Sequence, residues 1–355
     1  MKHIIRAKSL PPAPEVTNLC IEACAADQRL DNFLMRHLKG VPKTHIYRII
    51  RSGEVRINKG RARADTRLAI GDCVRLPPVR VSERVAAKGR AKNHAITQAT
   101  ETSKPARDIA ILFEDEHLIA INKPAGLAVH GGSGVSFGVI EQMRMVRSQA
   151  PFLELVHRLD RDTSGVLLLA KKRSALNHLQ DQFRQRQTGK TYLALVRGQW
   201  PAGLTVLDQP LHKYLCTTPE TPDGERRVRV VARDNPDGMT AMTLIGVVAS
   251  SPDYSLLQVT LKTGRTHQIR VHLAHAGHPI AGDDKYGDFE WNKSITHLPA
   301  GVVETAVGLR RMFLHAYRLQ FDHPVSHERH ELLAKLPAEL ERFAETVLGA
   351  AARAR

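Results

Sequence analysis

The feature of this sequence that most constrains its fold is a break in the hydrophobic pattern over residues 79–106. This segment has no regular apolar spacing and turns from basic to polar, with threonine, serine and proline towards its end. A stretch of this composition buries too little apolar surface to fold, so we predict a flexible linker. The 355-residue chain is therefore expected to form two domains, at residues 15–78 and 107–346, with a basic tail at 347–355.

Positive charge is concentrated before the larger domain. Residues 1–106 contain 21 lysine and arginine residues against 9 acidic residues, so +12 of the formal net charge of +16 lies there. Such a charge is expected of a protein that binds a polyanion, and RNA, DNA and an anionic membrane all fit it. No apolar run is long enough to span a bilayer, no secretory signal is present, and the four cysteines form no disulfide or zinc pattern. We therefore predict a soluble, cytoplasmic, monomeric protein.

The smaller domain begins with two stretches of helical apolar spacing. Leu30 and Leu34 belong to the first, Ile46 and Ile49 belong to the second, and Pro42 interrupts them. Short alternating strands follow. Basic side chains are dense on the second helix and the next hairpin, where they can follow successive phosphates: Lys43, Arg48, Arg51, Arg56, Lys59, Arg61 and Arg63. A solvated basic face on an ordinary small domain is the alternative interpretation.

The larger domain contains more strand-like segments than helical ones. Apolar stretches bounded by Gly, Asp and Pro predict strands within residues 111–124, 153–160, 165–172, 190–198, 254–262 and 313–321. Helical spacing predicts helices over 174–187, with Ser174 as N-cap, and over 266–276, ended by Gly277. Because strands mostly adjoin strands, we predict an α+β fold with a mainly antiparallel mixed sheet.

Motifs that would indicate a cofactor or a metal are incomplete. Gly189-Lys190-Thr191 ends like a phosphate loop, but Arg184 stands where its first glycine belongs. Four histidines lie close in sequence without a carboxylate or cysteine at ligand spacing: His267, His272, His275 and His278. We predict no metal and no cofactor. An RNA methyltransferase is disfavoured too, because no glycine-rich site for a methyl donor is found.

The segment HRLDRDTSG, residues 157–165, concentrates charged and turn-forming side chains between two apolar stretches. Judged by residue type alone, a charged turn with local backbone hydrogen bonds is an alternative interpretation. The nonapeptide resembles the signature of the RluA-type pseudouridine synthases. Three more stretches resemble the same family in the same order: INKPAGLAVHGG at 121–132, KTYLALVRG at 190–198 and LKTGRTHQIRVHLAHAGHPIAGDDKYG at 261–287. The resemblance covers about residues 109–325.

Residues 27–78 resemble the αL RNA-binding module first described in a ribosomal small-subunit protein. With this module and the segment FLHAYRLQFDHP at 313–324, the chain is most similar to the RluC subgroup of the family, whose members modify large-subunit ribosomal RNA. The resemblance implies that the chain isomerises specific uridines of ribosomal RNA to pseudouridine, without metal or cofactor. A non-catalytic, RNA-binding ribosome-assembly factor on the same fold is the alternative.

The resemblance also assigns roles to individual residues. Asp160 corresponds to the nucleophilic aspartate of the family, and the sequence leaves three modes open for it: attack on the ribose, attack on the ring, or assistance to elimination. A carboxylate in an apolar pocket needs a nearby cation to offset its desolvation, and Arg270 corresponds to the arginine that pairs with it. Arg265 lies in the same motif and is the other candidate for that ion pair, and otherwise a candidate for RNA contact.

Two further side chains are expected to handle the target base. Tyr192 corresponds to the tyrosine that stacks on it, although a tyrosine that fills the core would suit the same strand position. The uridine must leave its stack before it can react, and Arg158 corresponds to the arginine that enters the space left in the RNA. His157 is expected to orient the loop, and Asp162 to bind backbone within the turn.

Overall fold

The computed structural model describes residues 16–22, 25–38, 41–79, 109–131, 137–218, 221–296 and 308–349. The chain divides into two compact units, Met1–Ser103 and Lys104–Arg355, which are described separately below. The predicted linker, apart from residue 79, and residues 350–355 of the predicted tail lie outside the described residues. None of the described helices is long and apolar enough to cross a membrane.

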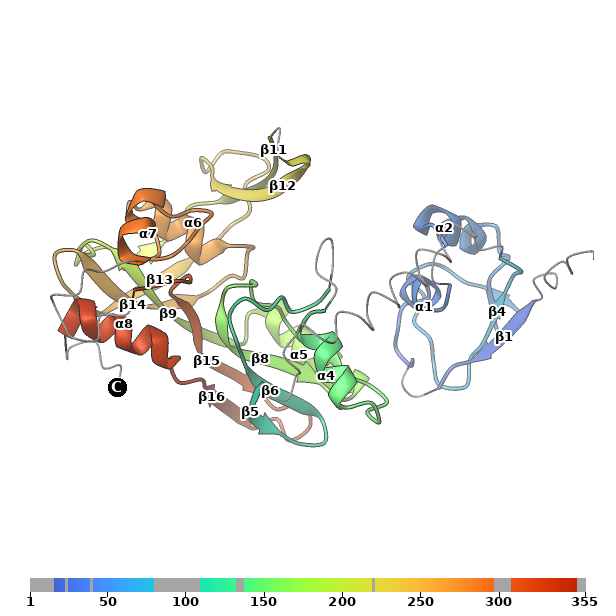
Figure 1. Ribbon diagram of the computed structural model, residues 1–355. Coiled ribbons are helices and arrows are strands. Elements are labelled where there is room, and N and C mark those ends of the chain that lie inside the picture. The colour runs from blue at the N-terminus through green and yellow to red at the C-terminus, as the bar shows by residue number, and fades with distance from the viewer. Residues whose placement is uncertain are drawn as a thin grey trace, which may run out of the picture. The chain divides into compact units, whose positions relative to one another are not determined.

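The amino-terminal unit packs two helices against a small antiparallel sheet (Figure 1). The helices are α1, Leu30–His37, and α2, Lys43–Arg51. The strands lie in the order β1-β4-β2-β3 and comprise Thr17–Cys20 (β1), Arg56–Ile57 (β2), Gly60–Arg61 (β3) and Cys73–Leu76 (β4). The predicted pair of helices is present, and β1 adds a strand at the edge that the sequence pattern did not indicate.

The apolar spacing explains how this unit folds. Leu30 and Leu34 of α1, Ile46 and Ile49 of α2 and Val74 of β4 are buried in one shared core. Burial of such side chains contributes about 1.5–3 kcal/mol each, before the entropy of ordering the chain is subtracted. The basic residues of α2 fall on the opposite, exposed face of that helix.

Within the described residues, ten strands of the carboxyl-terminal unit form one sheet. Its main path runs β10-β13-β14-β9-β15-β8-β6-β5, with β16 added to β15 and β7 added to β8. The pairings are antiparallel except for β8 with β15, which is parallel. The predicted α+β class with a mainly antiparallel mixed sheet is thus confirmed. The strands are Ala110–Glu114 (β5), Leu118–Lys123 (β6), Glu154–Leu155 (β7), Ser164–Ala170 (β8), Gly189–Arg197 (β9), Val206–Leu207 (β10), Thr243–Ser250 (β13), Tyr254–Leu261 (β14), Leu314–Asp322 (β15) and Arg329–Leu333 (β16).

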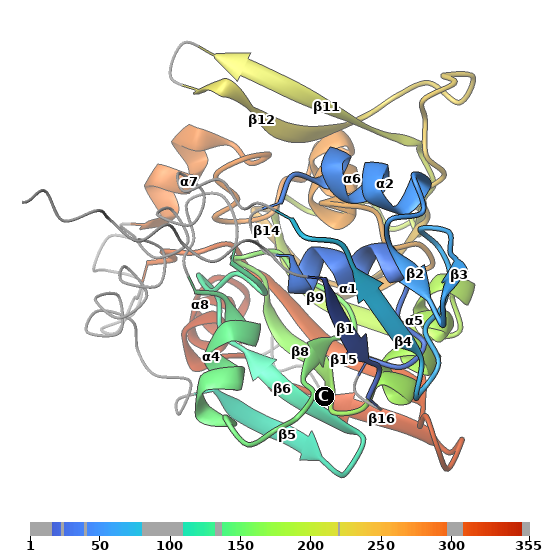
Figure 2. The ribbon, with the colours of Figure 1, turned by 90° about the vertical axis from the view of Figure 1, so that its right-hand side faces the viewer.

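A separate two-stranded hairpin projects beyond the large sheet. It consists of β11, Leu211–Thr218, and β12, Thr221–Val230. Figures 1 and 2 show it beside α6, Gln268–His275, with which β12 makes contact. The other helices of this unit are Val139–Val146 (α4), Arg173–Gln185 (α5), Phe289–Thr296 (α7) and Ala338–Leu348 (α8).

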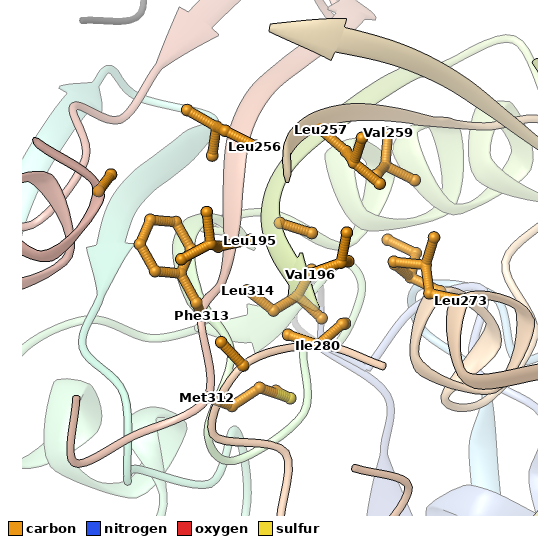
Figure 3. Packing of buried hydrophobic residues seen from close by; sticks show 14 of the residues in the cluster. Leu195, Val196, Leu256, Leu257, Val259, Leu273, Ile280, Met312, Phe313 and Leu314 are labelled. Atoms are coloured by element: carbon orange, nitrogen blue, oxygen red, sulfur yellow. The ribbon is translucent and has the colours of Figure 1, made fainter. Parts of the chain in front are cut away.

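The largest core cluster joins the middle of the sheet to α6 and α8. Figure 3 shows part of it, with Val196 of β9 and Leu257 and Val259 of β14 on the side of Leu273 of α6. Ile269 and Leu273 of α6 are both buried there. Since α6 carries Arg270 between these two positions, the packing of its apolar side chains sets where that arginine points.

Some predicted boundaries differ from the structure. Helix α5 begins at Arg173 after an N-cap at Lys172, so Ser174 lies inside the first turn and does not cap it. Only Glu154 and Leu155 of the predicted strand at 153–160 are extended in a ladder, because the remaining apolar residues fill the core from a loop. Helix α8 continues to Leu348, two residues beyond the predicted end of the domain.

Candidate active site

The loop with the HRLDRDTSG motif connects β7 to β8, and its end is held against β15. At Gly165 the backbone φ is +114°, and a Cβ there would lie 2.2 Å from the carbonyl oxygen of Ala316. Gly165 and Ser164 are also the residues of β8 that pair in parallel with β15. Only glycine satisfies this conformation and this close approach, which explains the glycine that ends the motif.

Asp160 lies in this loop with a half-buried carboxylate that faces two side chains from the start of α6. Its Oδ2 is 3.4 Å from Nη1 of Arg270 and 3.8 Å from Nε2 of His267. The carboxylate and the two α6 residues are 110 or so positions apart in sequence, and the fold brings them together. Of the two arginines considered for the ion pair, Arg270 is the one that reaches Asp160.

Arg270 is held in place by a second carboxylate. Its Nε and Nη2 each donate a 2.7 Å hydrogen bond to Asp283, and its guanidinium lies 5.1 Å from the ring centre of Tyr286. Burial opposes the charge on Arg270, but the hydrogen bonds and charge of Asp283 outweigh it, so the pKa of Arg270 is raised. The bidentate geometry fixes the plane of the guanidinium and leaves Nη1 directed at Asp160. Arg265, by contrast, donates from Nε to the carbonyl of Thr240.

Asp160 borders a cavity of about 240 Å³ in which Tyr192 and Phe183 present rings. Tyr192 comes from β9 and is half-buried, with its ring also packed against two of the core clusters. Burial, and then the negative charge of Asp160, raise the pKa of Tyr192, so its hydroxyl stays protonated at neutral pH. An aromatic wall beside a carboxylate suits a planar base stacked next to a nucleophile.

A second cavity of about 520 Å³ adjoins the first, and the two share the lining residues Arg158, Leu159, Asp160, His267 and Arg270. The Arg158 side chain is exposed at this junction. An exposed guanidinium between two cavities, next to Asp160, is placed to contact RNA bases or phosphates. Asp162 departs from its expected role: its carboxylate accepts from Arg161 at 3.3 Å, and no backbone bond to it is found in the described residues.

The loop is braced by a buried lysine that sequence reasoning missed. Lys123, at the end of β6, is fully buried and donates from Nζ to the carbonyls of Pro124, Leu127 and Arg161, at 2.7–2.9 Å. Burial lowers the pKa of Lys123 to about 7. The available signal was a lysine that follows the apolar residues Leu118–Ile121 and Asn122, within the first family-like stretch.

His157 and Arg311 brace the other parts of the loop. The Nε2 of His157 accepts the backbone N–H of Leu168 at 3.1 Å, and its ring stacks on Phe183. Burial lowers the pKa of His157 to about 3, so the imidazole is neutral. Arg311, another residue that sequence reasoning missed, donates to Ser164 Oγ at 2.7 Å and to Glu339 of α8 at 3.1 Å. The loop is therefore tied to the sheet and to the last helix.

Three of the four histidines considered as metal ligands contact other protein groups, His267 among them through the Tyr286 hydroxyl. His272 contacts Thr243 and the carbonyl of Gln209, and His278 contacts the carbonyl of Arg197. Within the described ranges no group of three or more His, Cys, Asp or Glu side chains is arranged to hold a metal ion.

The basic residues predicted to contact RNA in the amino-terminal unit lie on its surface. Lys43, Arg48 and Arg51 of α2 and Arg56 of β2 are all exposed. None of the four forms an ion pair with a carboxylate in the part of the unit that the structure describes. Tyr47 and Arg51 line a shallow cavity of about 510 Å³ with three residues of the following hairpin, Arg61, Ala62 and Arg63.

Comparisons with known proteins agree with this geometry. Residues 117–275 match the family described as RNA pseudouridylate synthase, and residues 28–74 match the S4 domain. Ribosomal large subunit pseudouridine synthase C of Salmonella typhi is 47% identical over 334 residues, which cover 94% of this chain and 97% of that protein. The protein of the same name from Escherichia coli strain K12 is 48% identical over 93% of this chain and 96% of its own length.

A solved structure supports the same assignment. Human RNA Pseudouridylate Synthase Domain Containing 4 matches with a TM-score of 0.52 and 29% identity, over 72% of this chain and 95% of that structure. The predicted family, the S4-type module and the synthase activity are all confirmed by these matches. The chain belongs to the RNA pseudouridylate synthase family, as an RluA-type enzyme with an amino-terminal S4 domain.

Proposed function

We propose that this enzyme converts specific uridines of large-subunit ribosomal RNA to pseudouridine, with Asp160 as the nucleophile. The observation that carries the proposal is the position of Asp160, 3.4 Å from a fixed guanidinium and at the edge of a cavity that Tyr192 lines. The choice of RNA rests on the relatives, which are named ribosomal large subunit pseudouridine synthase C. Those names also favour catalysis over the non-catalytic assembly factor.

The reaction requires a nucleophile and a shielded cavity. The bond from ribose C1′ to uracil N1 breaks, the uracil rotates, and a new bond joins C1′ to C5. The C5 proton leaves and N1 gains a proton, so the product is an isomer and no electrons are exchanged. Asp160 supplies a carboxylate that forms a transient covalent bond to the nucleotide and is displaced later. Metal and cofactor have no step in this scheme.

The neighbouring residues have separate roles in the proposal. Arg270 is fixed by its two hydrogen bonds to Asp283 and orients the Asp160 carboxylate. Tyr192 stacks on the uracil while it rotates. Arg158 occupies the position vacated by the flipped uridine, where a guanidinium stacks on bases and contacts phosphate. Arg265, which lines the same cavity, contacts the RNA near the flipped nucleotide.

The two units divide the work in this proposal. Residues 15–78 bind RNA phosphates through Lys43, Arg48, Arg51 and Arg56, and residues 107–346 carry out the reaction. Residues 79–106 connect them and residues 347–355 form the tail. We further propose that the enzyme acts as a cytoplasmic monomer. Light scattering after size exclusion and imaging of a tagged chain test these two points.

The central test is tritium release from a large-subunit ribosomal RNA transcript that carries tritium at C5 of uridine, with EDTA present. We expect release by the wild type and a loss of at least about a thousandfold in Asp160→Asn, which keeps the shape and removes the nucleophilic charge. Asp162→Asn is the matched control and should stay within about threefold of wild type. Equal loss in both variants, or activity in Asp160→Asn, would contradict the role of Asp160.

The RNA class is tested in cells. Pseudouridine mapping of ribosomal RNA from cells that lack the gene should show the loss of sites in the large subunit only. Return of those sites with the wild type, and not with Asp160→Asn, assigns them to this enzyme. Intact large-subunit sites would refute the substrate and leave the reaction chemistry untouched.

A further inference from the structure

His267 is a non-glycine residue in a left-handed backbone conformation directly beside Asp160. It is the N-cap of α6, with φ 53° and ψ 19°. For a residue with a Cβ, this conformation costs of order 1 kcal/mol or more of conformational free energy. It persists where the surrounding structure enforces it. Here the conformation turns the imidazole into the space between Asp160 and Tyr286. Its side chain is 17% exposed.

The hydrogen bonds of Tyr286 determine the protonation of this imidazole. The Tyr286 hydroxyl accepts the backbone N–H of Val228 at 3.1 Å and lies 2.8 Å from Nδ1 of His267. A hydroxyl has one proton to donate, and His267 Nδ1 is the acceptor found for it among the described residues. Burial raises the pKa of Tyr286 to about 12 and lowers the pKa of His267, so the phenol is protonated and the imidazole neutral. Nδ1 is therefore the acceptor, and the ring proton is on Nε2.

The protonated Nε2 is the atom that faces Asp160, 3.8 Å from Oδ2. Hydrogen bonds in a free active site are often long and shorten when the substrate binds. The two shortest hydrogen bonds of Arg270 go to Asp283, so only its Nη1 faces Asp160. Arg270 therefore restrains the Asp160 carboxylate from one direction. A neutral N–H donor restrains the carboxylate from a second direction and adds no charge that would make it a weaker nucleophile.

We propose that His267 is a positioning residue that orients the Asp160 carboxylate for attack as the Nε2–H tautomer, which the Tyr286 hydroxyl selects. The proposal rests on the proposed role of Asp160 as nucleophile. The same chain of contacts links Asp160 to the β11–β12 hairpin. The Val228 N–H of β12 donates to the Tyr286 hydroxyl, which in turn contacts His267 beside Asp160.

Three single variants and one double variant test the proposal through kcat, KM and the pH profile of tritium release. His267→Ala removes the donor, and we expect kcat to fall about 10- to 100-fold with KM within threefold of wild type. His267→Gln places an amide N–H near the position of Nε2 and should recover most of that kcat. Melting temperatures and RNA retention on filters establish that the variants are folded and bind RNA.

Tyr286→Phe tests the choice of tautomer, because it keeps the ring against Arg270 and removes only the hydroxyl. The charged and titratable groups facing the imidazole are Asp160, Arg270, Asp283, Lys285 and Tyr286. Without the hydroxyl that donates to Nδ1, the pKa of the imidazole rises and His267 becomes protonated at a higher pH. Because the neutral imidazole is the active form in this proposal, the acid limb of the kcat profile should move to higher pH. In His267→Gln/Tyr286→Phe that shift should disappear.

The results separate the two proposals. Activity in Asp160→Asn refutes the nucleophile and with it this inference. If Asp160→Asn is inactive, an unchanged kcat in His267→Ala refutes the positioning role alone. A kcat loss that His267→Gln does not reverse, or an acid limb that stays in place in Tyr286→Phe, also refutes it.

Discussion

Arg48, Arg51 and Arg56 of the amino-terminal unit extend into solvent, whereas Arg270 of the carboxyl-terminal unit is buried between carboxylates. The first three form no ion pair in the described part of the unit, and the hydrogen bonds of Arg48 and Arg56 to nearby residues are 3.3–3.4 Å long. The fourth is fixed by two 2.7 Å hydrogen bonds. The difference shows that one residue type serves two purposes here. Exposed cations attract a polyanion over a distance that becomes shorter as the salt concentration rises, because salt screens their charge. A buried cation sets the geometry of a single carboxylate.

Arg270→Lys tests whether the buried arginine acts through its geometry or through its charge, and it is expected to have the largest effect of the variants that follow. Lysine keeps the positive charge but presents one point of donation, so it cannot hold Asp283 in a bidentate pair and also reach Asp160. We expect the single-turnover rate of tritium release to fall about 100-fold or more, with RNA affinity near wild type. A rate within about threefold of wild type would mean that charge alone suffices at this position.

A smaller effect is expected from Lys123→Met, which tests whether buried cations in the carboxyl-terminal unit support the fold. Three carbonyls would lose their donor, and we expect the free energy of unfolding to fall by about 2–4 kcal/mol. Urea denaturation at neutral pH measures this. Lys171→Met, at a partly exposed lysine, is the control and should change stability by less than about 1 kcal/mol.

The pH dependence of stability adds a second readout for Lys123. Its pKa is lowered by burial to about 7 from the ordinary 10.5, so the unfolded chain binds more protons between these two values. The contribution of this residue to stability is therefore lowest below about pH 7 and rises as the pH increases towards 10.5. Lys123→Met should lack that rise when it is compared with wild type across pH 6.5–9.5, a window of about three units. Parallel curves would show that Lys123 does not titrate in the folded protein.

The smallest effect concerns the exposed arginines. Replacing Arg48, Arg51 and Arg56 together with glutamine should lower RNA affinity by about tenfold at moderate salt and reduce the slope of log affinity against log salt by about 2–3. The rate at saturating RNA should change less than the affinity. Arg158→Ala is the matched control: it should slow the step in which the uridine is flipped and change the slope by less than about one. An unchanged slope in the triple variant would assign the basic surface to another partner.

Much of the fold was predictable because its signals are local. The spacing of Leu30, Leu34, Ile46 and Ile49 indicates two helices, and these residues are buried together. The excess of strand segments correctly predicts an antiparallel-rich sheet. The parallel pair of β8 and β15 was not predictable, because Ser164 and His315 are 151 residues apart and pair only once the sheet has formed. The β11–β12 hairpin, α4, α7 and α8 were also not indicated.

The candidate site was predictable where a motif carries it. Asp160, Arg270 and Tyr192 were named from short family-like stretches, and the structure brings them to one cavity. The same stretches contain Lys123, His267 and Asp283, but their residue types alone suggest a surface lysine, a metal ligand and a turn aspartate. Their contacts with Arg161, Tyr286 and Arg270 depend on long-range packing, which no local pattern encodes.

The sequence by itself determined the charge of the amino-terminal region, the class of the fold and the family to which the enzyme belongs. These follow from composition, apolar periodicity and motifs, all of which survive in a linear chain. The tertiary structure alone decided which arginine pairs with Asp160, which tautomer His267 adopts and where the loop is anchored. Those properties depend on distances of a few ångströms between groups more than a hundred residues apart or on separate elements, and only a packed core sets such distances.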